Sequence, residues 1–589
     1  MLKRNEKLIR TKLWQYMLPG VMLTASLQIG NVVDTMLVGN LLGTDAMSAV
    51  KIGMTIDNIM EMPGYVLAIG GSVAAGMLLG RRERERANCI FSTTFLVSVV
   101  CGVLFSLLSV FSPFLARLLT GGGPLEGDVS AFVRVTLLGG PIIGVILQLI
   151  SYVAVDNSPG IASAYVIVSN VINLTLDYLL LKFTPLGTAG AALSTILGYS
   201  LASVILIPYL RSSRRMLHFT MPKKELPAAL KLAFSTGLPT LFYMIFDTVR
   251  VLTLNTLIVR TMGEDSMAVF TVCDNVVLIT KMLVDGIINT ISTIGSVIYG
   301  EKDYFGVRAL VRNVLRYSYA VLAVLLLVLA VFTKQTVGLF GISDGPLLGM
   351  AVSSLRLFLF GLPFHVFNDF ITVYYQSTEK EKLSSLVTAL QNCAVVLPLA
   401  FLLVFLSGPG ESERLRGLMI ALVLGEAVTV FAVEILHRCR YHGENLLLLP
   451  SVQDEQVLDI SIDPAMEETS RVPQEILEFS KRCGIDRKKA NLIAVAAEEM
   501  AVNIIQYGGR RVHSIDINVS VTQDSLILRT RDNGIPFDPT HYTADADEFE
   551  IHGIELVKRI SDKVQYLRVL DLNNTTVEIA LKPAEVEHG

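Results

Sequence analysis

Three polar side chains that could bind a cation lie in stretches of the chain that are otherwise apolar. Asp34 occurs in NVVDTMLVG, and Asn173 and Asp177 occur in VINLTLDYLLL. A carboxylate at the centre of a bilayer costs about 2.5–3.5 kcal/mol, so such groups usually line a cavity or an ion path. Asn173 and Asp177 share one helix face, and with Asp34 they could form an oxygen-rich Na⁺ site or a proton site. The alternative is that Asp34 is hydrated near a helix end and that Asp177 is interfacial.

Other charged groups in apolar stretches have simpler explanations. Asp247 and Arg250 are three residues apart on one predicted helix and could neutralise each other. Asp369 could pair with another charge or lie near the end of a span. His365, a single histidine beside Pro363, is expected to be a packing residue rather than a proton relay.

The C-terminal part of the chain carries a second set of candidates. Glu499 and Asn503 share a helix face in AAEEMAVNIIQYGG, where the amide oxygen could hold a divalent metal against phosphates and the carboxylate could orient a nucleophile. Asp532 ends the strand-like SLILRTRD, so its carboxylate could accept from an adenine amino group, and Gly534 lets the backbone turn. Gly553 begins a helix in IHGIELVKRISD, which would let the backbone approach phosphates closely.

Composition assigns most of the chain to a membrane. Of 589 residues, 52% are hydrophobic and 17% are charged, whereas soluble domains carry about 25% charged residues. A bilayer core needs about 20 mostly apolar residues per helix, and runs of that length predict about twelve spans. The predicted spans are 13–33, 62–80, 88–116, 135–155, 157–176, 183–210, 232–259, 266–299, 317–333, 350–377, 383–410 and 417–436.

The distribution of basic residues predicts the orientation of these spans. Lys and Arg cluster after even-numbered spans, as in RRERER at 81–86, whereas TGGGPLEGD at 120–128 has neither. Cytoplasmic loops are enriched in Lys and Arg, so both termini are predicted to be cytoplasmic. The six cysteines show no metal-ligand spacing, which argues against zinc and disulfides, and no basic tract suggests nucleic acid.

The apolar part repeats itself at a constant offset in residue number. Two six-span halves in one orientation predict a transporter whose substrate path lies between the halves, at about 10–215 and 225–440. The matching pairs are Leu18-Pro19 with Leu238-Pro239, GTDAMSAV at 43–50 with GEDSMAVF at 263–270, and Gly80 with Gly300.

After His437 the chain takes on the character of a soluble domain. Residues 441–456 are predicted to be a linker, and residues 457–585 an α+β domain with helices at 465–482 and 487–507. VLDISIDP, HSIDINVSVT and SLILRTRD are predicted strands, and VQYLRVL with TTVEIAL is predicted to form a closing hairpin. The expected fold is therefore an all-α polytopic membrane domain over 1–440, followed by a smaller α+β domain.

The membrane part resembles a known transporter family. NVVDTMLVGNLLGTDAMSAV, NVINLTLDYLLLKFTPLGTAGAALST and the duplicated pattern are similar to the multidrug and toxic compound extrusion (MATE) transporters over about 10–440. This resemblance implies two six-span lobes and the export of organic compounds in exchange for Na⁺ or H⁺. It also implies coupling roles for Asp34, Asn173 and Asp177, and substrate or coupling roles for Asp247 and Asp369.

The C-terminal part resembles the GHKL ATPase fold, especially the anti-sigma-factor serine kinases, on the motifs around 496–509, 525–538 and 551–562. The resemblance implies that Glu499 is the catalytic base, that Asn503 holds Mg²⁺ with ATP, and that Asp532 reads adenine. Gly534 and Gly553 would be loop glycines of the nucleotide site. Ile551 stands where this family usually has the first glycine of its second glycine box.

The two resemblances together predict a multi-pass protein of the inner membrane. It would export small cationic or amphipathic compounds by Na⁺ or H⁺ antiport, with a cytoplasmic ATP-binding domain that regulates it or phosphorylates a serine. Membrane lipid and a cytosolic STAS-type antagonist protein are the other expected partners. One alternative is a membrane receptor in which the transporter-like part only binds ligand and the tail acts as a protein serine kinase. The other is a transporter whose C-terminal domain is an inactive scaffold.

Overall fold

The computed structural model describes residues 4–212, 215–220, 225–342, 344–441, 446–449, 456–541 and 553–581. The chain divides into two compact units, and the division does not follow the sequence linearly. One unit, called here the helical unit, contains Gln15–Lys302 and Val311–Leu446. The other, called the sheet unit, contains Met1–Trp14, Asp303–Leu310 and Leu447–Gly589.

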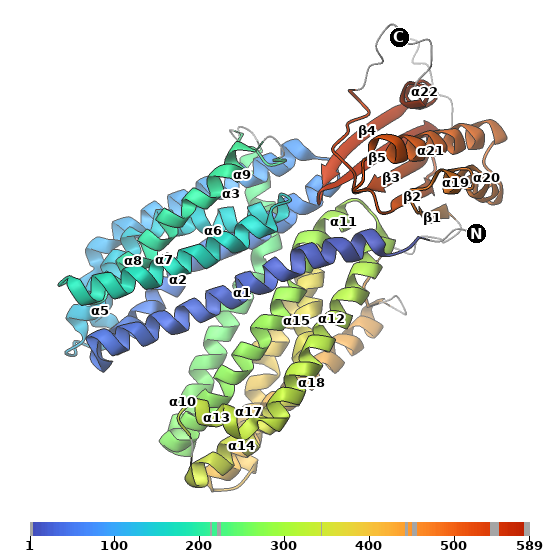
Figure 1. Ribbon diagram of the computed structural model, residues 1–589. Helices are drawn as coiled ribbons and strands as arrows, with labels where there is room; N and C mark the ends of the chain where they lie inside the picture. Colours follow the sequence, from blue (N-terminus) through green and yellow to red (C-terminus); the bar gives the residue numbers. More distant parts are fainter. Residues whose placement is uncertain are drawn as a thin grey trace. The chain divides into compact units, whose positions relative to one another are not determined.

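The helical unit consists of two bundles, drawn from blue to teal and from green to orange in Figure 1. The first bundle contains α1 (Lys7–Leu42), α2 (Thr44–Gly80), α3 (Arg84–Leu108), α4 (Ser112–Thr120), α5 (Glu126–Leu138), α6 (Gly140–Val155), α7 (Pro159–Phe183), α8 (Thr188–Ala202) and α9 (Ile207–Arg211). The second contains α10 (Leu226–Ile288), α11 (Ser296–Gly300), α12 (Tyr304–Val331), α13 (Thr333–Leu339), α14 (Gly345–Leu359), α15 (Leu362–Ser377), α16 (Glu381–Ala389), α17 (Val396–Leu406) and α18 (Glu411–Tyr441).

Nine helical runs in the described part of the chain are long and apolar enough to cross a membrane, and two bent helix pairs could each supply one more span. The run Leu226–Gly300 contains 75 residues, or about 110 Å of helix, against a hydrocarbon thickness of about 30 Å. It therefore holds two spans, separated at Gly263, where φ is 82°. Nine runs, two bent pairs and the second span of this long run together give twelve spans, which is the predicted number.

The internal repeat is visible in the backbone. Gly43, between α1 and α2, has φ 94° and ψ 176°, and its counterpart in the repeat, Gly263, has φ 82° and ψ −178°. This region of backbone conformation is open essentially to glycine alone. The two halves therefore turn from their first span into their second by the same backbone device.

The two halves also contact each other symmetrically. A Cβ atom added at Gly80 would collide with the carbonyl oxygen of Val297, and one added at Gly300 would collide with the carbonyl oxygen of Met77. Gly80 and Gly300 are counterparts in the repeat, and the same offset separates Met77 from Val297. Glycine at both positions lets the ends of α2 and α11 approach backbone to backbone around a pseudo-two-fold axis.

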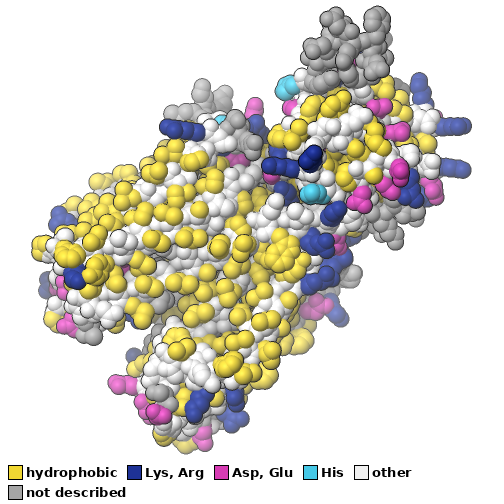
Figure 2. All heavy atoms as spheres, viewed as in Figure 1, with side chains coloured by type: hydrophobic (Ala, Val, Ile, Leu, Met, Phe, Trp, Pro, Cys, Tyr) yellow, Lys and Arg dark blue, Asp and Glu magenta, His cyan; other side chains and the backbone are white. Residues whose placement is uncertain are grey.

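The surface of the helical unit matches a membrane environment. Figure 2 shows apolar side chains covering the visible sides of the helices, while charged side chains gather near the helix ends. Exposed apolar residues include Leu107, Val110, Leu327 and Phe405, each more than 60% exposed. Such a surface in water would be a large apolar patch, whereas in a bilayer it faces lipid.

The sheet unit contains one antiparallel sheet with strand order β1-β2-β3-β5-β4. Its helices lie on one face of the sheet (Figure 1), and Ile460, Ile493, Ile517 and Leu528 are buried in the core between them. The strands are β1 (Val457–Ile462), β2 (Ile515–Val521), β3 (Ser525–Asp532), β4 (Lys563–Val569) and β5 (Leu572–Ala580), and the helices are α19 (Met466–Thr469), α20 (Val472–Arg482), α21 (Arg487–Tyr507) and α22 (Gly553–Ile560).

The alternation of residues along β2 explains why one face of the sheet is apolar and the other polar. Ile515, Ile517 and Val519 point to the helices, and Asp516 and Asn518 therefore point to the opposite face. Helix α21 begins at its predicted residue because the Asp486 carboxylate accepts hydrogen bonds from the backbone N–H groups of the first turn.

We expect Gly80→Ala and Gly300→Ala each to destabilise the full chain by about 1–3 kcal/mol, because a methyl group would be forced against backbone. The measurement is the thermal unfolding midpoint in detergent. Gly338→Ala is the matched control, since a Cβ there meets no atom within 4 Å and the residue is helical. A Gly80 or Gly300 variant as stable as the control would contradict the proposed close approach.

Candidate functional site

The structure brings the two predicted carboxyl groups of the first bundle together. Asp34 of α1 lies within hydrogen-bonding reach of Asp177 of α7, which is fully buried. The Ser194 hydroxyl of α8 donates to Asp177 Oδ1. Asp34 Oδ1 and Asp177 Oδ2 have no hydrogen-bond partner among the described residues. Two carboxyl groups can hydrogen-bond each other only when one of them carries a proton.

Asn173 joins this site through hydroxyl groups of α8. Its amide nitrogen donates to Thr195 Oγ1 at 3.1 Å and to Ser194 Oγ at 3.4 Å. Ser194 therefore contacts both Asn173 and Asp177, and it is a member of the site that the sequence did not single out. The three predicted residues and Ser194 form a continuous polar contact between α1, α7 and α8.

The register of α1 against α7 is set two helical turns away from the carboxyl pair. The Asn170 side-chain amide donates to the backbone oxygen of Ser26 at 2.6 Å, and Gly30 leaves room for the Asn170 side chain. Asp34 follows Ser26 by eight residues and Asp177 follows Asn170 by seven, which is about two turns on each helix. A single polar clamp therefore aligns the two acids.

Two further acids extend this site along α2, and the sequence analysis missed them. Asp57 is close enough to Asp34 to interact with it electrostatically, and Glu61 interacts in the same way with Asp57. The predicted second span began at residue 62, but α2 begins at Thr44 and contains both acids. The missed signal is their four-residue spacing, which places them on one face of a largely apolar helix.

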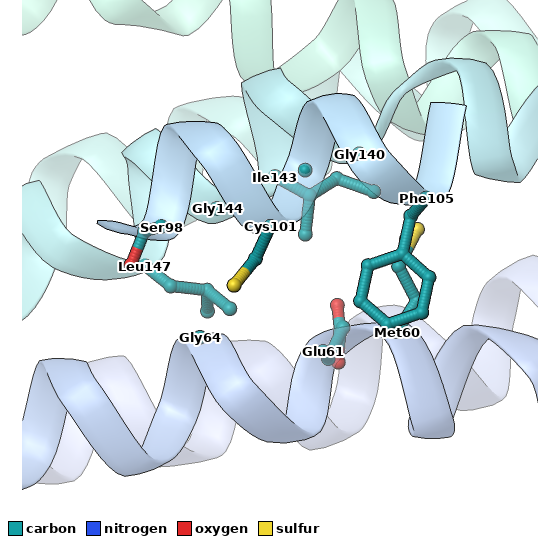
Figure 3. Close-up of a pocket in the computed structure, with 11 residues that line it drawn as sticks. Met60, Glu61, Gly64, Ser98, Cys101, Phe105, Gly140, Ile143, Gly144 and Leu147 are labelled. Carbon is teal, nitrogen blue, oxygen red and sulfur yellow. The ribbon is translucent and has the colours of Figure 1, made fainter. Parts of the chain in front are cut away.

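A small cavity lies beside Glu61. Figure 3 shows Glu61 pointing from α2 towards the helices that carry Cys101, Phe105 and Ile143. The cavity has a volume of about 10 Å³, which is room for about one water molecule. It is far smaller than the roughly 300–1,000 Å³ of typical small-molecule sites, so it suits hydration of the carboxyl group rather than an organic substrate.

The second bundle holds a cluster centred on His365, which was wrongly expected to be a packing residue. His365 Nε2 lies 2.8 Å from Asp369 Oδ2, and its Nδ1 lies 2.8 Å from Glu426 Oε1. The Gln391 amide donates to Asp369 Oδ1 at 3.0 Å, and Asn368 donates to Glu426 Oε2 at 2.8 Å. The predicted candidate Asp369 is therefore part of a buried carboxyl–imidazole–carboxyl arrangement, of which Glu426 was not foreseen.

Asp247 lies on α10 and pairs with Arg250, one of the two interpretations open from the sequence. Tyr243, one turn earlier on the same helix, lies close enough to both Asp247 and Asp369 to feel their charges. The two predicted acids of the second bundle therefore lie around the same tyrosine. Among the described residues, no group of three or more His, Cys, Asp or Glu side chains has a geometry that would hold a metal ion.

In the sheet unit, the structure brings Glu499, Asn503 and Gly553 together. A Cβ atom added at Gly553, the first residue of α22, would collide with the Glu499 carboxylate and lie 3.2 Å from Asn503 Nδ2. The Asn503 amide nitrogen donates to the backbone oxygen of Glu499 at 2.8 Å, so its amide oxygen is the atom that could hold a metal. Burial, and then the neighbouring Glu498, raises the pKa of Glu499, which strengthens it as a base.

Asp532 lies buried at the end of β3 and is oriented by two hydrogen bonds. Its Oδ1 accepts from the Gly534 backbone N–H at 2.7 Å and from Asn573 Nδ2 at 2.9 Å. Neither bond uses Oδ2, which could therefore accept from an adenine amino group. Burial raises the pKa of Asp532, and the bonds from Asn573 and Gly534 oppose that shift.

Gly534 is required by close packing. A Cβ atom there would lie 2.8 Å from Asp532 Oδ1 and 2.8 Å from the backbone oxygen of Gly508, at the end of α21. Asn573 was missed by sequence reasoning, although it pairs directly with Asp532 across the β3–β5 ladder. Ile551 lies outside the described residues.

The polar face of the sheet carries a buried ionic network, called here the Arg4 network. The Arg4 guanidinium contacts both carboxylate oxygens of Asp303, at 2.7 and 2.8 Å, and lies 3.4 Å from Asp459 and from Asp516. Arg531 of β3 contacts Asp303 Oδ2 at 2.8 Å. The Arg4 backbone N–H also donates to the Asp459 carbonyl at 3.1 Å. The sheet unit is therefore assembled from three separate stretches of the chain.

Electrostatics explain why Asp303 is tolerated in this network. Burial alone would raise the pKa of Asp303, but Arg4 and Arg531 outweigh it and lower the pKa below its ordinary value. A carboxyl group with a lowered folded-state pKa stabilises the fold above its unfolded pKa of about 3.9, and this stabilisation is lost as the pH falls further. At neutral pH the stabilisation contributed by Asp303 is therefore fully present.

Comparisons with protein families agree with this geometry. The MatE family model matches residues 19–179 and 239–402, two segments that begin at the equivalent prolines of the internal repeat. A second model, the histidine kinase-like ATPase domain, matches residues 462–580. Glu499, Asn503, Asp532, Gly534 and Gly553 all lie within the second match.

Individual proteins are similar to the membrane part. The multidrug export protein MepA of Staphylococcus saprophyticus is 24% identical over 417 residues, covering 69% of this chain and 89% of its own. The probable multidrug resistance protein YoeA of Bacillus subtilis is 22% identical over 353 residues, covering 57% of this chain and 75% of its own.

Solved structures share the fold of the membrane part. A transporter of the MOP superfamily from Pyrococcus furiosus superposes with a TM-score of 0.67 at 19% identity, covering 74% of this chain and 96% of that chain. An outward-facing multidrug resistance MATE family transporter gives a TM-score of 0.66 at 19% identity, with the same coverage. Because the MatE model matches more than half of the 589 residues, and does so twice at the offset of the internal repeat, the chain belongs to the MatE family and carries a C-terminal histidine kinase-like ATPase domain.

Proposed function

We propose that this chain exports small cationic or amphipathic organic compounds across the inner membrane in exchange for a cation, and that its C-terminal domain binds Mg·ATP to regulate export. The observation that carries the transport proposal is the buried contact between Asp34 and Asp177. The names of the similar proteins, multidrug export protein and probable multidrug resistance protein, support organic compounds as the substrate class.

The proton is the coupling ion that the Asp34–Asp177 contact favours. With a proton between them the two carboxyl groups attract each other, and without it they repel. Two like charges about 4 Å apart repel by about 4 kcal/mol at an effective dielectric constant of 20, which would shift a two-state equilibrium about a thousandfold. Loss of the proton would therefore separate α1 from α7 and create a negatively charged site that a cationic substrate could occupy.

The acids on α2 give this mechanism a route for the proton. Asp57 and Glu61 continue the chain of interacting carboxyl groups away from Asp34, and Glu61 lies beside a cavity that fits one water. The His365 cluster would be a second protonation site that responds to the same exchange, together with Asp247 and Asp369 near Tyr243. Coupling to Na⁺ at Asp34, Asn173 and Asp177 is the other outcome of the test below.

The C-terminal domain is proposed to bind nucleotide through the residues that the structure gathers. Bound Mg·ATP would supply a transferable phosphoryl group; Asn503 would hold the metal, Glu499 would act as base, and Asp532 Oδ2 would accept from adenine. Gly534 and Gly553 keep the loop and the start of α22 close to these groups. A serine on a cytosolic STAS-type protein is the phosphoryl acceptor we propose.

The Arg4 network would connect nucleotide binding to transport. Arg4 shortly precedes α1, and Asp303 directly precedes α12, so two helices of the membrane part follow residues that lie on the polar face of the sheet. Arg531 of β3 belongs to the same strand as Asp532, the proposed adenine acceptor. Because the N-terminal segment packs on the C-terminal domain, both termini would lie on one side of the membrane, which we assign as cytoplasmic.

A membrane receptor that binds ligand without moving it is the second candidate. It is favoured only by the presence of the kinase-like domain, whereas the buried acids of both bundles favour transport. The first prediction below separates the two.

Asp34→Asn should reduce pH-driven efflux of the organic cation ethidium from proteoliposomes by at least about tenfold, because the group that shares the proton is gone. Gradients of H⁺ and of Na⁺ are imposed separately across the membrane of proteoliposomes that contain the full-length protein. The gradient that drives ethidium efflux by the wild type identifies the coupling ion. Asp45→Asn, an exposed acid in the first turn of α2, is the control. Unchanged efflux in the Asp34 variant, or no efflux by wild type under either gradient, would refute the transport proposal.

Asn503→Ala in the full chain should abolish Mg·ATP binding measured by calorimetry, because the proposed metal ligand is removed. Asn491→Ala, an exposed asparagine three turns earlier on the same helix, should bind as wild type does. Wild-type protein that gives no heat with Mg·ATP would rule out the nucleotide proposal.

Asp303→Asn should weaken the Arg4 network by about 3–5 kcal/mol, because two buried guanidinium groups lose their shared carboxylate. We expect faster trypsin cleavage within residues 4–14 and a smaller effect of Mg·ATP on efflux. The control is Asp463→Asn, which removes an exposed ion pair with Lys7 on the same segment. Equal cleavage and equal ATP response in the two variants would contradict the coupling role.

A further inference from the structure

A larger pocket lies in the second bundle, away from every group considered so far. It has a volume of about 320 Å³ and lies between the end of α15, α16 and the last turns of α18. Its walls are largely aliphatic, formed by Leu383, Leu386, Val387, Val433 and Leu436. This volume reaches the lower end of the roughly 300–1,000 Å³ range of small-molecule sites.

The pocket opens towards the apolar surface of the bundle. Leu386 and Leu436, which line it, are 40% and 45% exposed. Phe431 and Ile435, on the adjoining surface of α18, are exposed as well. In a membrane protein such a surface faces lipid, so acyl chains rather than water are the neighbours of this opening.

One polar atom in the wall has no hydrogen-bond partner in the part of the chain that the structure describes. His437 is 6% exposed, and its Nε2 has no hydrogen-bond partner among the described residues. The other buried polar group of the wall, the Tyr375 hydroxyl, donates to the Leu446 carbonyl at 3.0 Å. A buried unpaired nitrogen costs about 1–3 kcal/mol, so His437 points to a ligand that supplies an acceptor.

A positive charge lies at the same end of the pocket. Arg440 is exposed, lines the pocket and lies over the Tyr441 ring, which in turn stacks on the His437 ring at a centroid distance of 5.5 Å. Its neighbour Arg438 is instead paired with Glu434 at 2.7 Å. The Arg440 guanidinium and His437 Nε2 thus form a polar end above an aliphatic interior.

We propose that this pocket binds an anionic phospholipid, with one acyl chain between α15, α16 and α18 and with the phosphate accepting from His437 Nε2 and pairing with Arg440. The occupant is a membrane lipid because the pocket opens on the lipid-facing surface, and it is anionic because Arg440 supplies a cation. Basic pockets between membrane helices are a known way of binding anionic headgroups.

The test uses the full-length protein in mild detergent, titrated with phosphatidylglycerol and, separately, with phosphatidylcholine or palmitate. Native mass spectrometry counts the lipids retained on each chain. Wild type should retain phosphatidylglycerol in preference to phosphatidylcholine, and Arg440→Gln should reduce this retention about fivefold. His437→Phe keeps the aromatic ring but removes Nε2, and Val387→Trp fills the pocket; both should also reduce retention.

Arg438→Gln is the matched control, because it removes the same charge two residues away from a side chain that is already paired. It should retain phosphatidylglycerol as wild type does. The proposal is overturned if Arg440→Gln and His437→Phe retain as much phosphatidylglycerol as Arg438→Gln. It is equally overturned if phosphatidylcholine binds as well as phosphatidylglycerol, or if palmitate binds and phosphatidylglycerol does not. Arg440→Gln alters only an exposed side chain, so the result does not depend on the pocket-filling variant folding.

Discussion

The contact between two carboxyl groups inside an apolar helix bundle is the constraint on which the transport account depends. Asp177 is fully buried and Asp34 half-buried, so two negative charges there would be poorly solvated, and we propose that the Asp34–Asp177 contact is stable only when a proton lies between them. The surrounding contacts serve this pair. The Ser26–Asn170 clamp sets its register, and the Ser194 hydroxyl donates a hydrogen bond to Asp177. In the proposed mechanism, a proton decides whether α1 and α7 attract or repel.

Buried carboxyl groups are also compensated in the second bundle and in the sheet unit, by different partners. In the second bundle the His365 ring lies between Asp369 and Glu426, where a protonated imidazole could donate to both carboxylates and compensate their charge. In the Arg4 network two guanidinium groups compensate three carboxyl groups. Buried charged groups are thus concentrated where two helices or two segments of the chain contact each other. Loss of the compensating charge at such a place would weaken that contact.

The Arg4 network also changes how the C-terminal domain is understood. Among the described residues, Arg4 and Asp303 contact the polar face of the stretch that matches a histidine kinase-like ATPase domain. A domain completed by the residues that precede α1 and α12 is physically continuous with two membrane helices. We propose that this arrangement serves a regulatory domain rather than a detachable enzyme.

Much of this architecture could be predicted from the sequence. The internal repeat was predicted from matching pairs of residues, and the structure adds that Gly43 and Gly263 share one conformation and that Gly80 and Gly300 make reciprocal contacts. Helix α21 was predicted at its observed bounds, and the gathering of Glu499, Asn503 and Gly553 followed from the motif order. These features are local or periodic, so the pattern of residues records them directly.

The features that could not be predicted depend on contacts between distant segments. Asp57 and Glu61 were excluded because a span was defined by the absence of charge, although α2 tolerates both acids where they face other carboxyl groups. The residues around His365 do not indicate that Glu426, which lies on a different helix, contacts the His365 ring. Arg4 and Asp459 lie near opposite ends of the chain, and no periodicity links the two.

Infrared difference spectroscopy of the full-length protein in lipid tests the central claim most directly, because it detects the C=O stretch of a protonated carboxyl group. The account predicts a protonated-carboxyl band in the wild type at neutral pH that disappears on alkalinisation and is absent from the Asp34→Asn variant. A wild-type spectrum without that band, or a band that persists unchanged when Asp34 is replaced, would contradict a proton shared between Asp34 and Asp177.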